Sequence, residues 1–296
     1  MLLSASAFGL QSSRRADEQE TPTFRTAVTV VTVPCIVEER GEFASGLRAE
    51  DFELYDEGRR RPIDYFVYEG GEEARPLTLA LLLDTSGSLK GSLGFEQDSA
   101  VAFLEGVLRP KVDMAAVIQF DSEISLVQDF TFDLDRLEQA IRQVRAGGAT
   151  KLYDAVWVAV EDLLQHEVGR RVMVVLSDGD DTASQVKARD AIRKAQEFDV
   201  QIFGIGVRTP GFASNFGKLS EFARETGGLF FNSKNRPEDL ERAFTKIHEA
   251  LRHQYTLGFT PVPEPGVQGG FHELEVKVKR RGLKVRCREG YYAQGG

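Results

Sequence analysis

The sequence predicts an α/β fold: a doubly wound, mostly parallel sheet inserted in a small β-rich accessory domain. Between residues 76 and 252, strand and helix signals alternate, which indicates a largely parallel sheet with helices on both faces. Two runs there, 77–83 and 172–176, are continuously apolar, as in strands buried on both faces. The flanking arms, 24–72 and 253–293, carry only strand and turn signals.

The strands of the central stretch are bounded by turn residues. The first apolar run lies between Pro76 and Gly87, and a short turn at 121–123 allows the two strands beside it to pair as a hairpin. A last edge strand begins at Gly228, the second glycine of a pair. In order, the predicted strands are 77–83, 114–120, 124–127, 172–176, 200–207 and 228–231.

Helices are predicted between these strands from apolar residues at helical spacing. The first ends before Pro110, which cannot continue a helix. Asp133 caps the second and Gly147 closes it, while Pro237 opens the last. The predicted helices are 95–108, 134–144, 152–166, 186–198, 218–224 and 237–251.

Neither β-rich arm has enough strands to bury a core alone. The predicted strands are 27–33, 51–55 and 63–68 in the first arm, and 255–260, 274–278 and 283–288 in the second. We infer that the arms pack together as one small domain, with the α/β domain of residues 76–252 inserted between them.

Composition limits the classes of function. The chain has 296 residues, 42% hydrophobic and 28% charged, with a net charge of −9, so nucleic acid is not an expected partner. No run of eighteen apolar residues exists, and no membrane span is expected. Residues 1–11 resemble the end of an export signal without its basic start; the alternative for residues 1–23 is a disordered terminus. We expect an exported protein, periplasmic or secreted.

Three segments end or begin with oxygen-bearing side chains. The first apolar strand stops at Asp84 and is followed by Ser86 and Ser88; Thr150 follows a glycine turn, and Asp178 follows the second buried strand. Carboxyl ends of parallel strands are where ligands bind in open α/β sheets. Hydroxyl and carboxylate oxygens without nearby His or Cys favour a hard cation such as Mg²⁺. If only one of these segments were present, a Ser or Asp that caps the next helix would explain it more simply than a cation site. Three such segments in order favour the cation site.

These five residues resemble the metal-ion-dependent adhesion site of von Willebrand factor A-type domains, which combines D-x-S-x-S with a distant Thr and a distant Asp. The resemblance implies that Ser86, Ser88 and Thr150 ligate Mg²⁺ through hydroxyls, with Mn²⁺ or Ca²⁺ as alternatives. It implies that Asp84 and Asp178 act through bound waters or hydrogen bonds. An ion held mostly by neutral ligands keeps charge to offer, so the expected partner is a protein with an exposed Asp or Glu.

The whole chain beyond residue 24 also resembles a bacterial family of exported proteins known as von Willebrand factor A-related. The matching segments are Gly46-Leu47, Glu50-Asp51-Phe52, the strand at 255–259 and the closing Gly290-Tyr291-Tyr292. These arm motifs are less specific than the metal site, and the family name implies no activity.

No pattern of catalytic residues accompanies the metal motif. The chain has no Gly-x-Ser-x-Gly elbow, no P-loop and no C-x-x-C. We therefore expect a binding module and not an enzyme. Two alternatives remain: a metal-dependent hydrolase, and a structural or assembly subunit whose metal site engages no outside ligand. The four histidines are scattered, at His166, His248, His253 and His272.

The two cysteines both fall in the arms. Cys35 lies in the first arm and Cys287 in the last predicted strand. In an exported protein they could form a disulfide that ties the arms together, stabilising by roughly 4–5 kcal/mol on the chain-entropy model. The alternative is a pair of buried thiols on separate strands.

Overall fold

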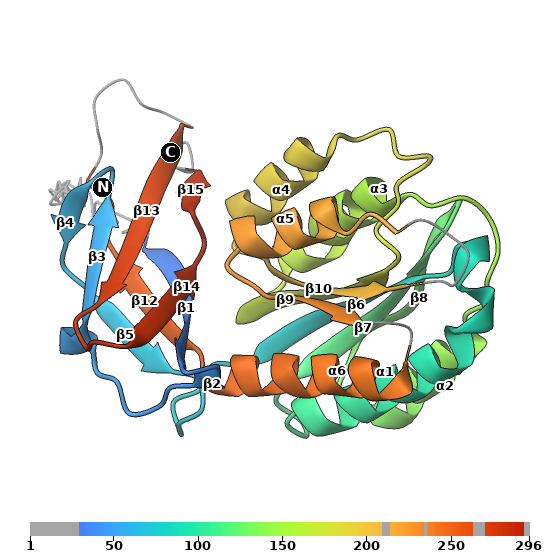
Figure 1. Cartoon of the computed structure of the whole chain (residues 1–296), viewed down its shortest axis with the longest axis horizontal. Coiled ribbons are helices and arrows are strands. Elements are labelled where there is room, and N and C mark those ends of the chain that lie inside the picture. The colour runs from blue at the N-terminus through green and yellow to red at the C-terminus, as the bar shows by residue number, and fades with distance from the viewer. Residues whose placement is uncertain (1–29, 209–213, 234–235, 263–269, 293–296) are drawn as a thin grey trace, which may run out of the picture.

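A computed structural model describes residues 30–208, 214–233, 236–262 and 270–292. Two units lie side by side, an α/β unit and a β-rich unit (Figure 1). The predicted fold class is confirmed. The predicted segment 1–23 lies outside the described residues.

The α/β unit contains a six-stranded sheet in the order β11-β10-β9-β6-β7-β8. All neighbours run parallel except β7 and β8, which form the predicted hairpin. Every residue of β6 is buried, as its continuous apolar run predicts. The strands are β6 (Leu77–Asp84), β7 (Met114–Phe120), β8 (Ile124–Thr131), β9 (Arg170–Ser177), β10 (Gln201–Val207) and β11 (Phe230–Ser233).

Helices cover both faces of this sheet, with α1, α2 and α6 on one face and α3, α4 and α5 on the other (Figure 1). Among the described residues, no helix is long and apolar enough to cross a membrane. The helices are α1 (Leu93–Val107), α2 (Leu134–Gln143), α3 (Leu152–Val158), α4 (Ala188–Glu197), α5 (Gly217–Glu225) and α6 (Pro237–Arg252), with the short 3₁₀ turn η2 (Gly87–Gly91) before α1.

One predicted helix differs in detail. The segment 152–166, expected to be one α-helix, continues after α3 as a π-helical turn, η3 (Ala159–Leu163), and a 3₁₀ turn, η4 (Leu164–His166). Its apolar residues still face the sheet, with Val160 and Leu164 buried. Their spacing fits an uninterrupted helix equally well, so the sequence carries no signal of the change.

Two packed sheets make up the β-rich unit, with strand orders β14-β1-β12-β5, where β2 also pairs with β1, and β15-β13-β3-β4. Both sheets contain strands from both ends of the chain, which explains why neither arm suffices alone. The elements are β1 (Val31–Glu39), β2 (Glu42–Phe43), η1 (Ala49–Asp51), β3 (Phe52–Asp56), β4 (Arg59–Arg61), β5 (Tyr65–Tyr68), β12 (Tyr255–Phe259), β13 (Phe271–Val278), β14 (Leu283–Cys287) and β15 (Gly290–Tyr292).

The α/β unit is inserted between two neighbouring strands of the accessory unit. The chain leaves β5 for β6 and returns from α6 to β12, and β5 and β12 are antiparallel partners with Tyr68 opposite Tyr255. The amide of Glu69 donates to the carbonyl of Gln254, 2.9 Å away, so the two connections run side by side. Both ends of the insertion are therefore held at one place.

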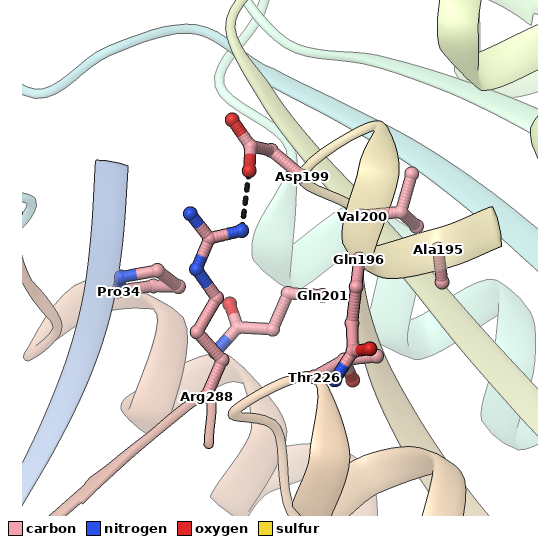
Figure 2. A pocket seen from close by; sticks show the side chains of 8 residues that line it. All are labelled: Pro34, Ala195, Gln196, Asp199, Val200, Gln201, Thr226 and Arg288. Atoms are coloured by element: carbon pink, nitrogen blue, oxygen red, sulfur yellow. Dashed lines mark hydrogen bonds and ion pairs between the residues drawn. The ribbon is translucent and has the colours of Figure 1, made fainter. Parts of the chain in front are cut away.

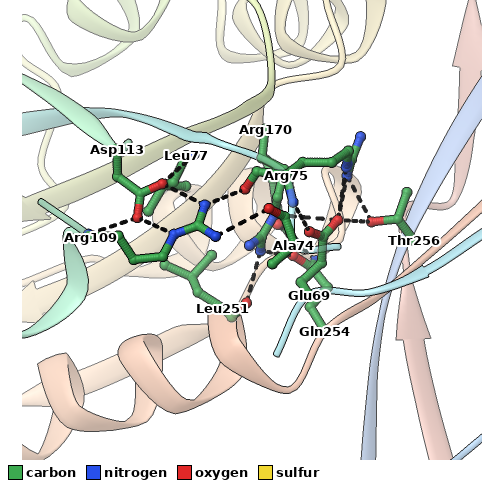
Figure 3. A network of polar contacts seen from close by, with 11 residues as sticks. Glu69, Ala74, Arg75, Leu77, Arg109, Asp113, Arg170, Leu251, Gln254 and Thr256 are labelled. Carbon is green, nitrogen blue, oxygen red and sulfur yellow. Dashed lines mark hydrogen bonds and ion pairs between the residues drawn. The ribbon is translucent and has the colours of Figure 1, made fainter. Parts of the chain in front are cut away.

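A buried carboxylate organises this joint (Figure 3). Glu69, fully buried, accepts hydrogen bonds from the Arg75 guanidinium at 2.7 and 2.9 Å and from the Thr256 hydroxyl at 2.7 Å. Arg170, at the start of β9, lies 3.7 Å from the same carboxylate and donates to the carbonyl of Leu251 at the end of α6. Burial lowers the pKa of Arg170 to about 10, and the Glu69 charge opposes this shift.

A second ion pair continues the network beneath β6. Arg109 donates to Asp113 at 2.7 and 2.9 Å and to the carbonyl of Arg75 at 2.7 Å (Figure 3). Asp113 also accepts from the amide of Leu77, the first residue of β6, at 2.8 Å. The start of the central strand is thus fixed by charged hydrogen bonds, which are stronger than neutral ones.

On the opposite side of the joint, the accessory unit contacts the loop between α4 and β10. Arg288 forms an ion pair with Asp199, next to a small pocket that Pro34 and Gln201 also line (Figure 2). The Thr32 hydroxyl donates to the other oxygen of Asp199, 3.3 Å away. Residues from both ends of the chain therefore contact Asp199, in the same turn of the α/β unit.

The buried position of Glu69 leads to a stability prediction. Glu69→Gln removes the carboxylate that Arg75 and Arg170 share and should lower the free energy of unfolding by about 3 kcal/mol. The same exchange at Glu249, which pairs on the surface with Lys246, should cost about 0–1 kcal/mol. Urea unfolding of both variants measures the difference; equal losses would show that the network does not stabilise the joint.

Candidate functional site

Two acidic residues meet where adjacent parallel strands end. Asp84 is the last residue of β6 and Asp178 directly follows β9, and the two strands are in register with Leu83 opposite Leu176. Both strands begin at the joint with the accessory unit. At about 3.3 Å per residue, an eight-residue strand places the acidic end roughly 23 Å away from that joint.

Asp84 is held rigidly in a buried position. Its side chain is 0% exposed; one oxygen accepts from the amide of Ser86 at 2.9 Å and the other from the hydroxyl of Ser177 at 2.6 Å. The Ser177 hydroxyl in turn accepts from the amide of Gly179, 3.0 Å away. Ser177 therefore joins the ends of β6 and β9, a role that the sequence analysis missed because serine is common at strand ends.

The loop that carries Thr150 is fixed from both sides. On one side, the amide of Gly147 donates to the carbonyl of Thr85 at 2.6 Å, and the amide of Gly87 donates to the carbonyl of Gly148 at 3.2 Å. On the other side, the carbonyl of Thr150 accepts from the amides of residues 182 and 183 at 2.9 and 3.0 Å. The three predicted segments are thus linked by main-chain hydrogen bonds.

Two glycines permit this close approach. Gly148 has φ +84° and Gly179 has φ +82°, a left-handed conformation that other residues rarely adopt. A Cβ atom on Gly148 would lie 2.6 Å from the Ser122 hydroxyl, and one on Gly179 would lie 2.4 Å from the carbonyl of Asn215. Side chains at either position would push the Thr150 or Asp178 loop out of place.

The serines of the D-x-S-x-S segment lie in the turn after β6. Ser86 is 3% exposed and precedes η2, and Ser88 is part of η2. The side chain of Ser88 lies outside what the structure describes. Ser86, Thr150 and Asp178 are each at most 5% exposed, and Asp178 accepts from the amide of Asp180 at 3.2 Å. Which of these oxygens would ligate an ion stays a prediction.

A third buried carboxyl group lies close enough to Asp84 and Asp178 for their charges to affect its pKa. Glu96, on α1, is 2% exposed, and its Oε1 has no hydrogen-bond partner among the described atoms. Burial raises the pKa of Glu96 to about 8 against a hydrogen bond with Ser92, and the charges of Asp84 and Asp178 raise it further. In the sequence, Glu96 stands in the polar run Glu-Gln-Asp-Ser, typical of an exposed helix face, so the sequence analysis missed it.

The electrostatics of this edge favour a positive ion. Burial raises the pKa of Asp84 to about 7, although hydrogen bonds from Ser177 and Ser86 lower it, and the charge of Asp178 raises it again. Burial is thus the main cause of both raised pKa values, and the charges of the neighbouring acids add to it. Within the described residues, no three His, Cys, Asp or Glu side chains lie close enough to hold a metal ion. A cation here would depend on hydroxyl ligands, as the donor chemistry of Ser86 and Thr150 allows.

Comparisons with known proteins agree with the observed fold. The model of the von Willebrand factor type A domain matches residues 78–246, more than half of the chain. A mouse protein, inter alpha-trypsin inhibitor heavy chain 4, is 27% identical over 183 residues, which is 56% of this chain and 19% of that protein. An uncharacterized protein of Borreliella burgdorferi is 24% identical over 181 residues, 52% of this chain and 53% of that protein.

Two solved structures have similar folds. A von Willebrand factor type A protein from Catenulispora acidiphila aligns with a TM-score of 0.53 at 12% identity, over 92% of this chain and 75% of that chain. The von Willebrand factor domain of the type V pili tip protein Mfa5 from Porphyromonas gingivalis aligns with a TM-score of 0.51 at 15% identity, over 59% of this chain and 94% of that chain. The first alignment extends the likeness in fold beyond the α/β unit.

The buried acid on α1 predicts an unusual pH dependence. Because the folded protein holds the Glu96 proton up to a pKa of about 8, and the unfolded chain releases it near its ordinary value of 4.5, metal-free stability should fall as pH rises from 5 to 8. Glu96→Gln, which keeps the shape of the neutral acid, should raise the free energy of unfolding by about 1–3 kcal/mol at pH 8 and change it little at pH 5.

Chemical unfolding in chelator at both pH values measures this effect. Glu105→Gln, on an exposed position of the same helix, is the matched control and should show the wild-type dependence. A Glu96→Gln variant with unchanged pH dependence would mean that this carboxyl group is not protonated in the folded protein.

Proposed function

The chain belongs to the von Willebrand factor type A domain family, and we propose that it is a Mg²⁺-dependent protein-binding module of an exported protein. Domains of this family typically mediate protein–protein interactions. The requirement for a metal ion and the acidic residue of the partner are what we propose beyond this family role. The observation that carries it is that Asp84 and Asp178, both buried, lie at the ends of neighbouring strands, where main-chain hydrogen bonds hold the turn of Ser86 and the loop of Thr150 beside them.

The residue types at this edge suit a hard cation. Ser86, Ser88 and Thr150 would hold Mg²⁺ through hydroxyl oxygens, while Asp84 and Asp178 balance its charge; Mn²⁺ or Ca²⁺ would use the same oxygens. A positive ion would offset the repulsion among the acids. The hydrogen bonds that Asp84 accepts from Ser86 and Ser177 orient its carboxylate before any ion binds.

An acidic protein partner follows from the same arrangement. A cation with mostly neutral ligands keeps charge to attract an outside group, and a bound ion supplies an open position for a carboxylate oxygen. The loops around Ser86, Thr150 and Asp178 lie at the end of the sheet remote from the accessory unit. We therefore assign them as the binding surface for an exposed Asp or Glu.

Export is supported by proteins that share this fold. Proteins of similar fold include the pilus tip protein named above and an aerotolerance-related membrane protein from Bacteroides fragilis, which aligns with a TM-score of 0.50 at 16% identity over 59% of this chain. We propose the accessory β-rich unit as a platform that carries the binding unit.

The metal requirement is tested by removing one hydroxyl. Mg²⁺ at ten times its Kd should stabilise the wild-type protein by about 1.4 kcal/mol and raise Tm by about 3–6 °C relative to chelator. Thr150→Val keeps the main-chain groups that fix this loop and removes the side-chain oxygen, so the Mg²⁺ shift should disappear. Differential scanning calorimetry with Mg²⁺ and with chelator measures both.

Thr78→Val is the matched control at the other end of β6. It removes a buried hydroxyl that donates to the carbonyl of Val168 at 3.0 Å, so it should lower Tm and leave the Mg²⁺ shift intact. Partner proteins captured with Mg²⁺ should be released by chelator, be lost by Thr150→Val and not by Thr78→Val, and fail to bind after amidation of their carboxylates. A wild-type Tm that does not respond to millimolar Mg²⁺ would refute the proposal.

A further inference from the structure

The structure places the two cysteines directly opposite each other. Cys35 on β1 pairs with Cys287 on β14 in an antiparallel register, although 252 positions separate them in the chain. Opposed residues of antiparallel strands have Cα atoms about 4.5–5.5 Å apart and side chains on the same face. That separation falls within the range that disulfides span. Both residues are free thiols in the structure.

The two thiols differ in surroundings. Cys35 is fully buried in the core of the β-rich unit, where burial and the neighbouring Cys287 raise its pKa. A hydrogen bond with Cys35 lowers the pKa of Cys287, and the positive charge of Arg288 acts in the same direction. Cys287 is therefore the better nucleophile of the pair, because the thiolate is the reactive form.

Cys287 is also the accessible member. It lines a groove of about 230 Å³ between the two units, together with Arg224, Arg286 and Arg288. Two glutamates, Glu275 and Glu289, line the same groove, so its charged side chains are three positive and two negative. Each arginine is paired with an acid, Arg224 with Glu289, Arg286 with Glu38 and Arg288 with Asp199. The groove therefore offers a small disulfide room to reach Cys287, whereas Cys35 has no exposed surface.

We propose that Cys35 and Cys287 form a cross-strand disulfide by reaction with a small-molecule disulfide that enters this groove. The Cys287 thiolate attacks one sulfur of the reagent, a mixed disulfide forms, and the first reagent thiolate leaves and takes a proton from water. Cys35 then gives its proton to water and its thiolate attacks the Cys287 sulfur, expelling the second reagent thiolate. The protein dithiol is oxidised, and one disulfide is reduced to two thiols.

The disulfide would link the chain segments before and after the α/β unit, so that the unit lies within the loop that the disulfide closes. β1 belongs to the first arm and β14 to the last, so the link joins the two segments that flank the insertion. Because unfolding separates these arms, a crosslink between them removes conformations from the unfolded state. Export to an oxidising compartment would then stabilise the accessory unit without changing the candidate metal site.

The test is oxidation of the full chain by oxidised glutathione. The wild-type protein should lose both free thiols, stay monomeric, release two glutathione molecules per chain, and gain about 10 °C in Tm. Intact-mass spectrometry after blocking of free thiols should show the loss of two hydrogen atoms. Tryptic peptides under non-reducing conditions should contain Cys35 linked to Cys287.

Single variants establish the order of attack. Cys35→Ala should stop at one glutathione adduct on Cys287, and Cys287→Ala should leave Cys35 unreacted while the protein is folded. If Cys35→Ala does not fold, the transient wild-type adduct, located by peptide mapping, gives the same information. Two stable glutathione adducts, thiols that persist in the folded wild-type protein, or a disulfide between chains would each overturn the proposal.

Discussion

The burial of carboxyl groups at one edge of the central sheet is the constraint on which this structure depends, because it raises the pKa of Asp84 to about 7 and that of Glu96 to about 8. Asp84 and Asp178 are brought together because β6 and β9 are neighbouring parallel strands, the first ending at Asp84 and the second directly before Asp178. Glu96 on α1 adds a third acid, with one oxygen that has no partner among the described atoms. Such a cluster persists only if protons or a cation reduce its charge. At the proposed site, bound Mg²⁺ takes the place of the protons and reduces this charge.

The same strands are anchored at their other ends by charged hydrogen bonds. β9 begins at Arg170, Arg75 lies two residues before the first residue of β6, and both arginines meet the buried Glu69 (Figure 3). The carbonyl of Leu251 at the end of α6 accepts from Arg170 as well. The accessory unit therefore contacts the α/β unit through the Glu69 joint and through the Arg288–Asp199 ion pair, while the proposed binding surface lies at the opposite edge of the sheet.

Local sequence signals were sufficient for the fold and for the approach of the three motif segments, and insufficient wherever contacts depend on distant pairing. The apolar run that ends at Asp84 predicts its strand because burial on both faces requires that composition. Glu96 was missed because its helix carries charge around it, and Glu69 because it precedes a polar linker. The register of Cys35 with Cys287 depends on the pairing of β1 with β14, strands from opposite ends of the chain, which no spacing along the chain specifies.

A crystal of the full chain soaked with Mn²⁺ tests the central claim most directly, because anomalous scattering locates this ion without assumptions about its ligands. We expect one strong anomalous peak at the acidic edge of the sheet, among the oxygens of Ser86, Ser88 and Thr150, with Asp84 and Asp178 nearby. The same soak of Thr150→Val should lack it. A crystal that takes up Mn²⁺ elsewhere and shows no peak at this edge would contradict the account.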